Sequence, residues 1–135
     1  MEQQVILIAN DIYNSLGPGY NEVVYHRAFE VALRLSNITY ESEVITPIFY
    51  KGHNIGHGRV DIKLNNFIIE LKAINNLNND AIIQTKNYMD HYSISSGMII
   101  NFSQNGKMKF ILLQNGNIFD FINGTFIGRN EITLI

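Results

Sequence analysis

Three side chains of this sequence, Asp61, Glu70 and Lys72, are suited by type and spacing to chemistry on a charged group. Glu70 and Lys72 are two residues apart, so on a β-strand they would share one face. Carboxylate oxygens are the ligands that hard divalent cations prefer. A lysine on the same face could stabilise negative charge that develops during a reaction.

The two carboxylates lie in segment 59–73, in which alternating apolar runs flank Asn65 and Asn66. Paired turn formers between such runs predict a tight β-hairpin. With these two residues as the loop, Asp61 falls directly opposite Glu70. Like charges that face each other with Cβ atoms about 5 Å apart are destabilising, so this register favours a divalent metal ion between them.

The predicted hairpin has one apolar and one charged face. The apolar face comprises Val60, Ile62, Leu64, Phe67, Ile69 and Leu71, and the charged face comprises Arg59, Asp61, Lys63, Glu70 and Lys72. An alternative without metal is a solvated surface of crossed salt bridges. Arg59 and Lys63 could contact phosphates or serve as ion-pair partners of the carboxylates.

The composition limits the classes of protein that are compatible with the sequence. A length of 135 residues with 46% hydrophobic and 16% charged residues predicts one globular domain over residues 1–135. A net charge of −2 excludes a broad basic surface, so nucleic acid would be contacted through a local patch or a bound metal. The absence of cysteine excludes disulfides and thiolate metal sites. With no secretory signal or membrane-spanning apolar stretch, an intracellular protein is expected.

The N-terminal third is predicted to be helical. Apolar residues at helical spacing run from Val5 to Leu16, and Gly17-Pro18-Gly19 ends this helix. A second helix is expected from about Tyr20 to Leu35. Its predicted buried face comprises Val24, Ala28, Val31 and Leu35.

The rest of the chain predicts a mixed sheet with one further helix. A strand over 39–51 and a glycine-rich turn with Gly52, Gly56 and Gly58 precede the hairpin. Asn78 or Asn79 could cap a helix that reaches about Tyr92. Buried strands at 97–102 and 108–113 follow, so strand, helix and strand predict a βαβ unit. Turn signals at 115–116 and 123–124 divide the remainder into short β-like runs.

Several of these segments resemble the PD-(D/E)XK nuclease superfamily. The resemblance rests on the hairpin with Asp61 and Glu70-Leu71-Lys72. Residues 19–25 resemble the GxxExxY signature of one branch, and residues 84–88 resemble the QxxxY element of RecB-like and phage-exonuclease-like members. The resemblance covers roughly residues 5–113. It implies an α/β fold, a restriction-endonuclease-like sandwich whose central mixed β-sheet is flanked by helices, with residues 114–135 as a β-rich C-terminal extension.

The resemblance also implies a set of site residues and a cofactor, Mg²⁺ or Mn²⁺. The implied metal ligands are Asp61, Glu70, Glu22 and the carbonyl group of Leu71. The implied catalytic residues are Glu22, Asp61, Glu70, Lys72, Gln84 and Tyr88, and the candidate substrate contacts are Arg59, Lys63, Lys86 and Tyr25. The implied substrate is a nucleic acid, with DNA favoured.

Simpler structural explanations exist for several of these residues. Glu22 could be a first-turn acid that the helix dipole favours. Tyr25 could hydrogen-bond Glu22 or pack between helices, and Gln84 and Tyr88 could be ordinary helix-face residues. Three histidines are expected to be peripheral: His53 and His57 in a solvated turn, one of them near the rim of the site, and His26 on the surface.

Three functions follow from this reading. The first is a metal-dependent nuclease that hydrolyses phosphodiester bonds of DNA with a metal-activated water. The second is a catalytically weak or inactive nuclease-fold module that binds nucleic acid or protein as a scaffold, which the low positive charge favours. The third is a metal-dependent hydrolase of a small phosphoester. The apolar C-terminal extension, or a free sheet edge, could pair with another copy to give a homodimer.

Overall fold

The protein is an α/β sandwich built on one mixed sheet. The computed structural model describes the backbone over residues 1–122 and 125–131 and the side chains over residues 1–121. The elements are α1 (Glu2–Leu16), α2 (Glu22–Leu35), β1 (Glu41–Tyr50), β2 (His53–Leu64), β3 (Phe67–Lys72), α3 (Asn79–His91), β4 (Ser96–Asn101), β5 (Lys109–Gln114), β6 (Asn117–Ile122) and β7 (Thr125–Glu131). Within the described residues, no helix is long and apolar enough to cross a membrane.

The seven strands are ordered in the sheet as they are in the sequence. All neighbouring strands are antiparallel except β3 and β4, which are parallel. Helix α3 connects these two strands, so the predicted βαβ unit is confirmed. Asn78 caps α3 as predicted, because its side-chain oxygen accepts a hydrogen bond from the Asp80 N–H at 3.0 Å.

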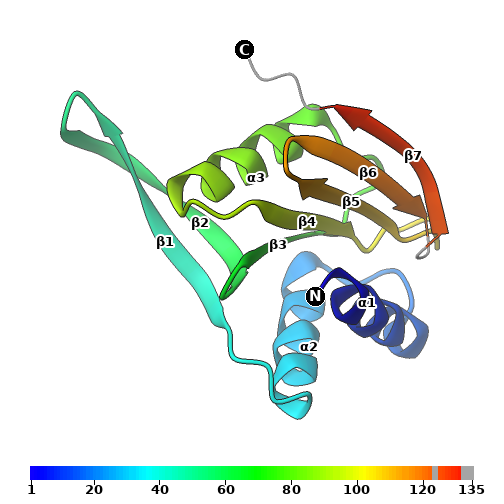
Figure 1. The fold of residues 1–135 in the computed structure, drawn as a ribbon. Helices are drawn as coiled ribbons and strands as arrows, with labels where there is room; N and C mark the ends of the chain where they lie inside the picture. Colours follow the sequence, from blue (N-terminus) through cyan, green and yellow to red (C-terminus); the bar gives the residue numbers. More distant parts are fainter. Residues whose placement is uncertain (123–124, 132–135) are drawn as a thin grey trace.

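Helices cover both faces of the sheet (Figure 1). Helices α1 and α2 pack on one face, where Ile69 of β3 and Ile100 of β4 belong to the larger core cluster. Helix α3 packs on the other face, against Ile68 and Ile99. Because side chains alternate along a strand, the central strands are apolar on both sides. The alternative of a solvated strand face is therefore wrong for β3, since α3 covers that face.

Helix α2 buries a different face from the predicted one. The buried residues are Tyr25, His26, Phe29 and Leu33, whereas Val31 and Leu35 are 46% and 79% exposed. Tyr25 fixes this rotation, because its ring stacks on Phe102 with centroids 4.4 Å apart and its hydroxyl donates to the Gly17 carbonyl at 2.6 Å. The same rotation buries His26, which was expected at the surface, within 2.9 Å of the Ser42 hydroxyl.

Strands β1 and β2 form a long arm that projects from the sheet (Figure 1). The predicted glycine-rich turn is only partly right, because the turn is limited to Lys51 and Gly52, with φ values of 47° and 79°. Strand β2 then begins at His53 and runs through Gly56 and Gly58. The two histidines predicted in a turn therefore lie on a strand.

The C-terminal extension adds strands β6 and β7 to the sheet. Asn115 and Gly116 form the predicted turn before β6, and their φ values of 51° and 82° match a two-residue hairpin turn. The turn predicted at residues 123–124 lies outside the described residues, as does the chain from residue 132 onward.

Candidate functional site

The backbone ladder between β2 and β3 ends where the two carboxylates begin. The paired residues are Ile62 with Ile69, Lys63 with Ile68, and Leu64 with Phe67, so the predicted register is confirmed for these three pairs. At the next position the side chains take over the hydrogen bonding. The Leu71 N–H donates to Asp61 Oδ2 at 2.8 Å, and the Asp61 N–H donates to Glu70 Oε1 at 3.3 Å.

A change of strand face at Asp61 explains this arrangement. In the β1–β2 ladder, Ser42 pairs with Ile62 and Val44 pairs with Val60. Glu43, between the two β1 residues, has a φ of 53°, which is unusual for a non-glycine residue in a strand. On one side of this point Ile62 joins the core beneath α1 and α2, and on the other side Val60 joins the core beneath α3. Val60 was predicted on the same face as Ile62, and that prediction is wrong because the strand switches faces between them.

The two carboxylates are buried, with Asp61 8% and Glu70 3% exposed. Burial raises the pKa of Glu70 to about 9, and the negative charge of Asp61 adds to the rise. The Asp61 N–H and Lys72 oppose this rise without cancelling it. Without a cation, Glu70 therefore holds a proton at neutral pH. The pair is electrostatically unfavourable in its ionised form and suited to a positively charged ligand.

Glu22 and Lys72 both line a cavity of about 380 Å³, which Gln84 also lines. Burial raises the pKa of Glu22, and the charge of Asp61 raises it further, while Lys72 lowers it. Glu22 is thus close enough to both residues to feel their charges. Its place at the first turn of α2 suits the helix dipole, but its surroundings are those of the carboxylate pair.

Tyr88 links α3 to the strand that carries Asp61. Its hydroxyl accepts a hydrogen bond from the Arg59 N–H at 3.0 Å. Burial raises its pKa and the charges of Glu70 and Asp61 raise it too, whereas the hydrogen bonds with Arg59 and Gln84 lower it. Gly58 is required for this approach, because a Cβ at that position would lie 2.4 Å from the Tyr88 hydroxyl oxygen.

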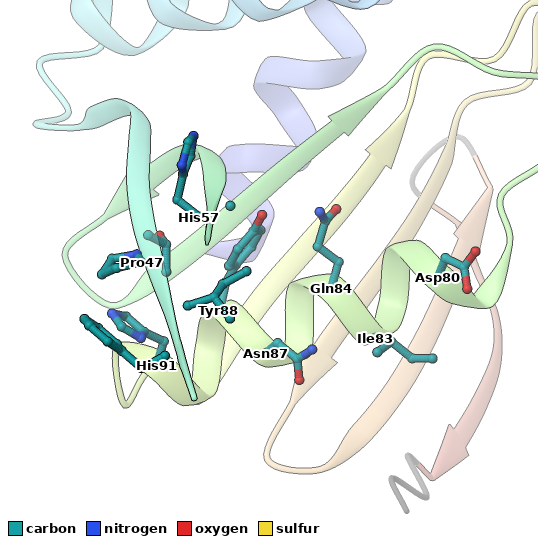
Figure 2. Close-up of a pocket in the computed structure, with 12 residues that line it drawn as sticks. Pro47, His57, Asp80, Ile83, Gln84, Asn87, Tyr88 and His91 are labelled. Carbon is teal, nitrogen blue, oxygen red and sulfur yellow. The ribbon is translucent and has the colours of Figure 1, made fainter. Parts of the chain in front are cut away.

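A groove of about 680 Å³ lies between the arm and α3. Figure 2 shows Pro47 and His57 of the arm on one side of it and Gln84 and Tyr88 of α3 on the other. Asp80 and Gln84 line both this groove and the smaller cavity with Glu22 and Lys72, so the two spaces are neighbours.

The candidate substrate contacts are placed less favourably. Tyr25 is fully buried and its hydroxyl bonds Gly17 rather than Glu22, so it packs the helices and does not face a substrate. Lys63 pairs with Glu41 at 3.6 Å and lies over the Tyr92 ring at 5.3 Å.

Two further cations are also paired with acids. Arg59 pairs with Glu43 at 3.7 Å, and Lys86 pairs with Asp90 at 2.5 Å. Both basic residues that flank Asp61 in sequence, Arg59 and Lys63, therefore have acidic partners other than the two central carboxylates.

Sequence reasoning missed several residues that border the site. Asp80 lies one helical turn before Gln84 and lines both cavities, and this spacing of four was the signal that could have identified it. Ile48 and Phe49 form part of the groove wall. The apolar run that contains them was interpreted only as strand. His57 borders the groove, whereas His53 is exposed on the arm.

The carboxylate oxygens of Asp61 and Glu70 are suitable ligands for a hard divalent cation that retains several waters. Among the described residues, no three His, Cys, Asp or Glu side chains group closely enough to form a cage for a metal. Magnesium does not need such a cage, because one or two carboxylates with waters suffice. Asp61 and Glu70 provide two buried carboxylates, and no basic side chain among the described residues is hydrogen-bonded or paired with either.

Comparison with known proteins gives one family match. A family model described as the PD-(D/E)XK nuclease superfamily matches residues 1–112. A crystal structure of SSO0001 is similar with a TM-score of 0.48 and 17% sequence identity, over 78% of this chain and 50% of that chain. The present chain therefore spans about half the length of that protein. No curated protein matches the chain.

Proposed function

The chain belongs to the PD-(D/E)XK nuclease superfamily, and we propose that it is a metal-dependent nuclease that cleaves DNA. Its α/β sandwich is the restriction-endonuclease-like fold of that superfamily. The observation that carries the proposal is the buried pair of Asp61 and Glu70, each hydrogen-bonded to a backbone N–H of the opposite strand. As part of the same proposal, we place the chain in the GxxExxY branch of the superfamily, because residues 19–25 match that pattern.

Asp61, Glu70 and the carbonyl oxygen of Leu71 would hold Mg²⁺ or Mn²⁺. Glu22 would reach the ion through a water, because it does not join the other two acids in a three-residue cluster. The chemistry that such an ion supplies is a lowered pKa of bound water and neutralisation of phosphate charge. Ionisation of Glu70 is the change that this chain must undergo on loading, since its raised pKa keeps it protonated beforehand.

The remaining residues would position water and phosphate. Lys72 carries the positive charge of the cavity that Glu22 also lines, so it can stabilise negative charge on the phosphate as the bond breaks. Glu22, whose pKa is raised by burial, can accept a hydrogen bond from the attacking water. Gln84 would contact the phosphate, and Tyr88 would hold the strand of Asp61 in place through the Arg59 N–H.

Arg59 and Lys86 are proposed as contacts to the substrate backbone. Each now pairs with an acid, Glu43 or Asp90, at the protein surface. Exchange of such a partner for phosphate gains little, because exposed ion pairs contribute at most about 1 kcal/mol. We therefore expect the binding of DNA to be weak and sensitive to salt. The proposed place of action is inside the cell.

Cleavage of labelled DNA with Mg²⁺ or Mn²⁺ tests the function. Glu70→Gln removes a proposed metal ligand, and Lys72→Met removes a positive charge that can stabilise the reacting phosphate. Each substitution should therefore reduce cleavage by at least about 100-fold. Glu41→Gln and Lys63→Met are matched controls, because this exposed acid and its lysine partner form a separate pair. Wild-type cleavage rates in the first two variants would contradict the assignment.

A scaffold that keeps the fold without cleaving is the second candidate. The observation that favours it is the pairing of Arg59, Lys63 and Lys86 with acidic side chains, which leaves few cations for phosphate. Absence of cleavage on DNA, RNA and small phosphoesters with either metal, together with a co-purifying partner, would support it.

Strand β7 is the last strand of the described sheet, and its outer edge is the surface we propose for pairing with a second copy.

A further inference from the structure

Two hydrogen bonds connect the walls of the groove between the arm and α3. The Arg59 N–H donates to the Tyr88 hydroxyl at 3.0 Å, and the hydroxyls of Thr46 and Tyr92 are 2.8 Å apart. These two contacts tie the arm to α3 at two points. The groove is therefore a built feature of about 680 Å³, within the usual size range of small-ligand pockets.

The lining of the groove is unsuited to phosphate. None of its lining residues, all in the described part of the chain, is lysine or arginine, and Asp80 is acidic. Ile48, Phe49 and Ile83 provide apolar and aromatic surface, and Gln84 and Asn87 provide amide groups. His57 and His91 add flat imidazole rings at the two sides (Figure 2). Such a lining suits a flat, neutral group with hydrogen-bonding edges.

The groove also borders the cavity that contains Glu22 and Lys72. Asp80 and Gln84 line both spaces, and the second space contains Glu22 and Lys72. Tyr88 lines the groove and is close enough to Glu70 and Asp61 for their charges to raise its pKa. A ligand in the groove would therefore be next to whatever lies at the carboxylate pair.

We propose that this groove binds an unpaired nucleobase of the strand whose phosphate lies at Asp61 and Glu70. The inference rests on the proposed nuclease function and assigns its substrate as single-stranded or locally unpaired nucleic acid. A base in a duplex is stacked and paired, so its entry would first require extrusion at a cost in free energy. Stacking on aromatic side chains accepts every base, and it also compensates for the scarcity of cations near the site.

Phe49 is the residue that tests this binding mode. It is 58% exposed and lines the groove, whereas its neighbour Tyr50 is 59% exposed and does not line it. Phe49→Ala should weaken binding of a single-stranded oligonucleotide by about tenfold, the order expected when one base-stacking ring is lost. Tyr50→Ala is the matched control and should bind within about twofold of the parent. Ile83→Ala on α3 provides a second test from the opposite wall.

Binding is best measured by fluorescence anisotropy with Glu70→Gln in every protein, so that cleavage does not consume the probe. The probes are a single strand, its duplex, and the same strand with one abasic nucleotide. Single strands should bind more tightly than the duplex, and Phe49→Ala should affect the duplex little. Equal binding by the Phe49→Ala and Tyr50→Ala proteins, tighter binding of the duplex, or no binding of nucleic acid would each overturn the inference.

The two proposals can fail separately. Cleavage of DNA without any effect of Phe49→Ala would contradict the nucleobase groove and leave the nuclease function intact. Phe49-dependent binding of single strands without cleavage by the unmodified protein would contradict the nuclease function and support the groove. Competition between an apolar peptide and the single strand can be compared in the parent and the Phe49→Ala protein. Equal competition in both would identify a different occupant of the groove and overturn the inference.

Discussion

The two ends of the β2–β3 hairpin use the same register for different purposes. At the turn end, backbone pairs such as Leu64 with Phe67 are complete and apolar side chains fill the core. At the other end, crossed hydrogen bonds from backbone N–H groups to the Asp61 and Glu70 carboxyl oxygens replace the backbone ladder. The turn end stabilises the fold, whereas the carboxylate end buries two acids whose joint ionisation is favourable only with a cation beside them.

The largest effect on stability is expected at the turn end of the hairpin. Ile69 is fully buried and pairs with Ile62, so Ile69→Ala should lower the free energy of unfolding by about 2–5 kcal/mol. Urea unfolding measures this. Ile55→Ala is the matched control, because Ile55 is 64% exposed on β2 and should cost less than about 0.5 kcal/mol. Equal effects would mean that the turn end is not the stabilising one.

The carboxylate end should instead show an unusual dependence of stability on pH. Because the pKa of Glu70 is raised from 4.5 to about 9 in the folded protein, folding binds a proton between these pH values. Its contribution is complete below the unfolded pKa and is lost as the pH rises towards the folded one. The free energy of unfolding without metal should therefore fall between about pH 6 and 8, by at most about 1.4 kcal/mol per pH unit.

Glu70→Gln is the control for this pH dependence. The amide has nearly the shape of the carboxyl group and carries no charge, so the slope should flatten and the metal-free protein should be more stable at about pH 8. Added Mn²⁺ should stabilise the wild-type protein more at the higher pH, since loading removes the proton. Thermal unfolding at several pH values measures both effects. A wild-type slope that Glu70→Gln leaves unaltered would assign the pH dependence to another group.

A smaller effect is expected where α3 supports the carboxylate end. Gly58→Ala places a methyl group against the Tyr88 hydroxyl, so it should cost about 1–3 kcal/mol and disturb the hydrogen bond to Arg59. Tyr88→Phe removes the oxygen that the methyl meets first. The double variant should therefore recover part of the stability that Gly58→Ala loses, as measured by urea unfolding. Strictly additive losses would mean that the two residues do not meet.

The smallest effect on stability is expected for the lysine near the turn. Lys63 pairs with the exposed Glu41, so Lys63→Met should change the free energy of unfolding by less than about 1 kcal/mol. The same substitution at Lys72, near the carboxylates, should stop cleavage. Loss of cleavage in Lys63→Met with Lys72→Met unaffected would reverse the roles of the two ends.

Local patterns predicted much of this fold. The loop at Asn65 and Asn66, the helix stop at Gly17 and the cap at Asn78 are formed by residues whose own chemistry sets the backbone. The register that brings Asp61 near Glu70 followed from the loop alone. Lys72, Glu22 and Gln84 line one cavity. This grouping was expected from the resemblance to a known family, and no local sequence pattern predicts it.

The errors occurred where distant contacts decide the structure. Helix α2 has two apolar stripes, and the stacking of Tyr25 on Phe102, which directly follows the remote strand β4, selects the one that is buried. The change of face at Asp61 accompanies a positive φ at Glu43, a backbone conformation that a glutamate in a strand does not predict. Gly58 was interpreted as a turn former because its role, to admit the Tyr88 ring, involves a helix about 30 residues later.

The central claim is that Asp61 and Glu70 together bind a divalent metal. Crystals soaked in Mn²⁺ test it directly, through anomalous difference density measured in wild-type and Glu70→Gln protein. We expect a peak between the two carboxylates in the wild type, within about 2.0–2.3 Å of an oxygen of each, and no peak in Glu70→Gln. If saturating Mn²⁺ gave no peak in the wild type, and both side chains were still hydrogen-bonded to the opposite backbone N–H groups, the proposed metal site would be contradicted.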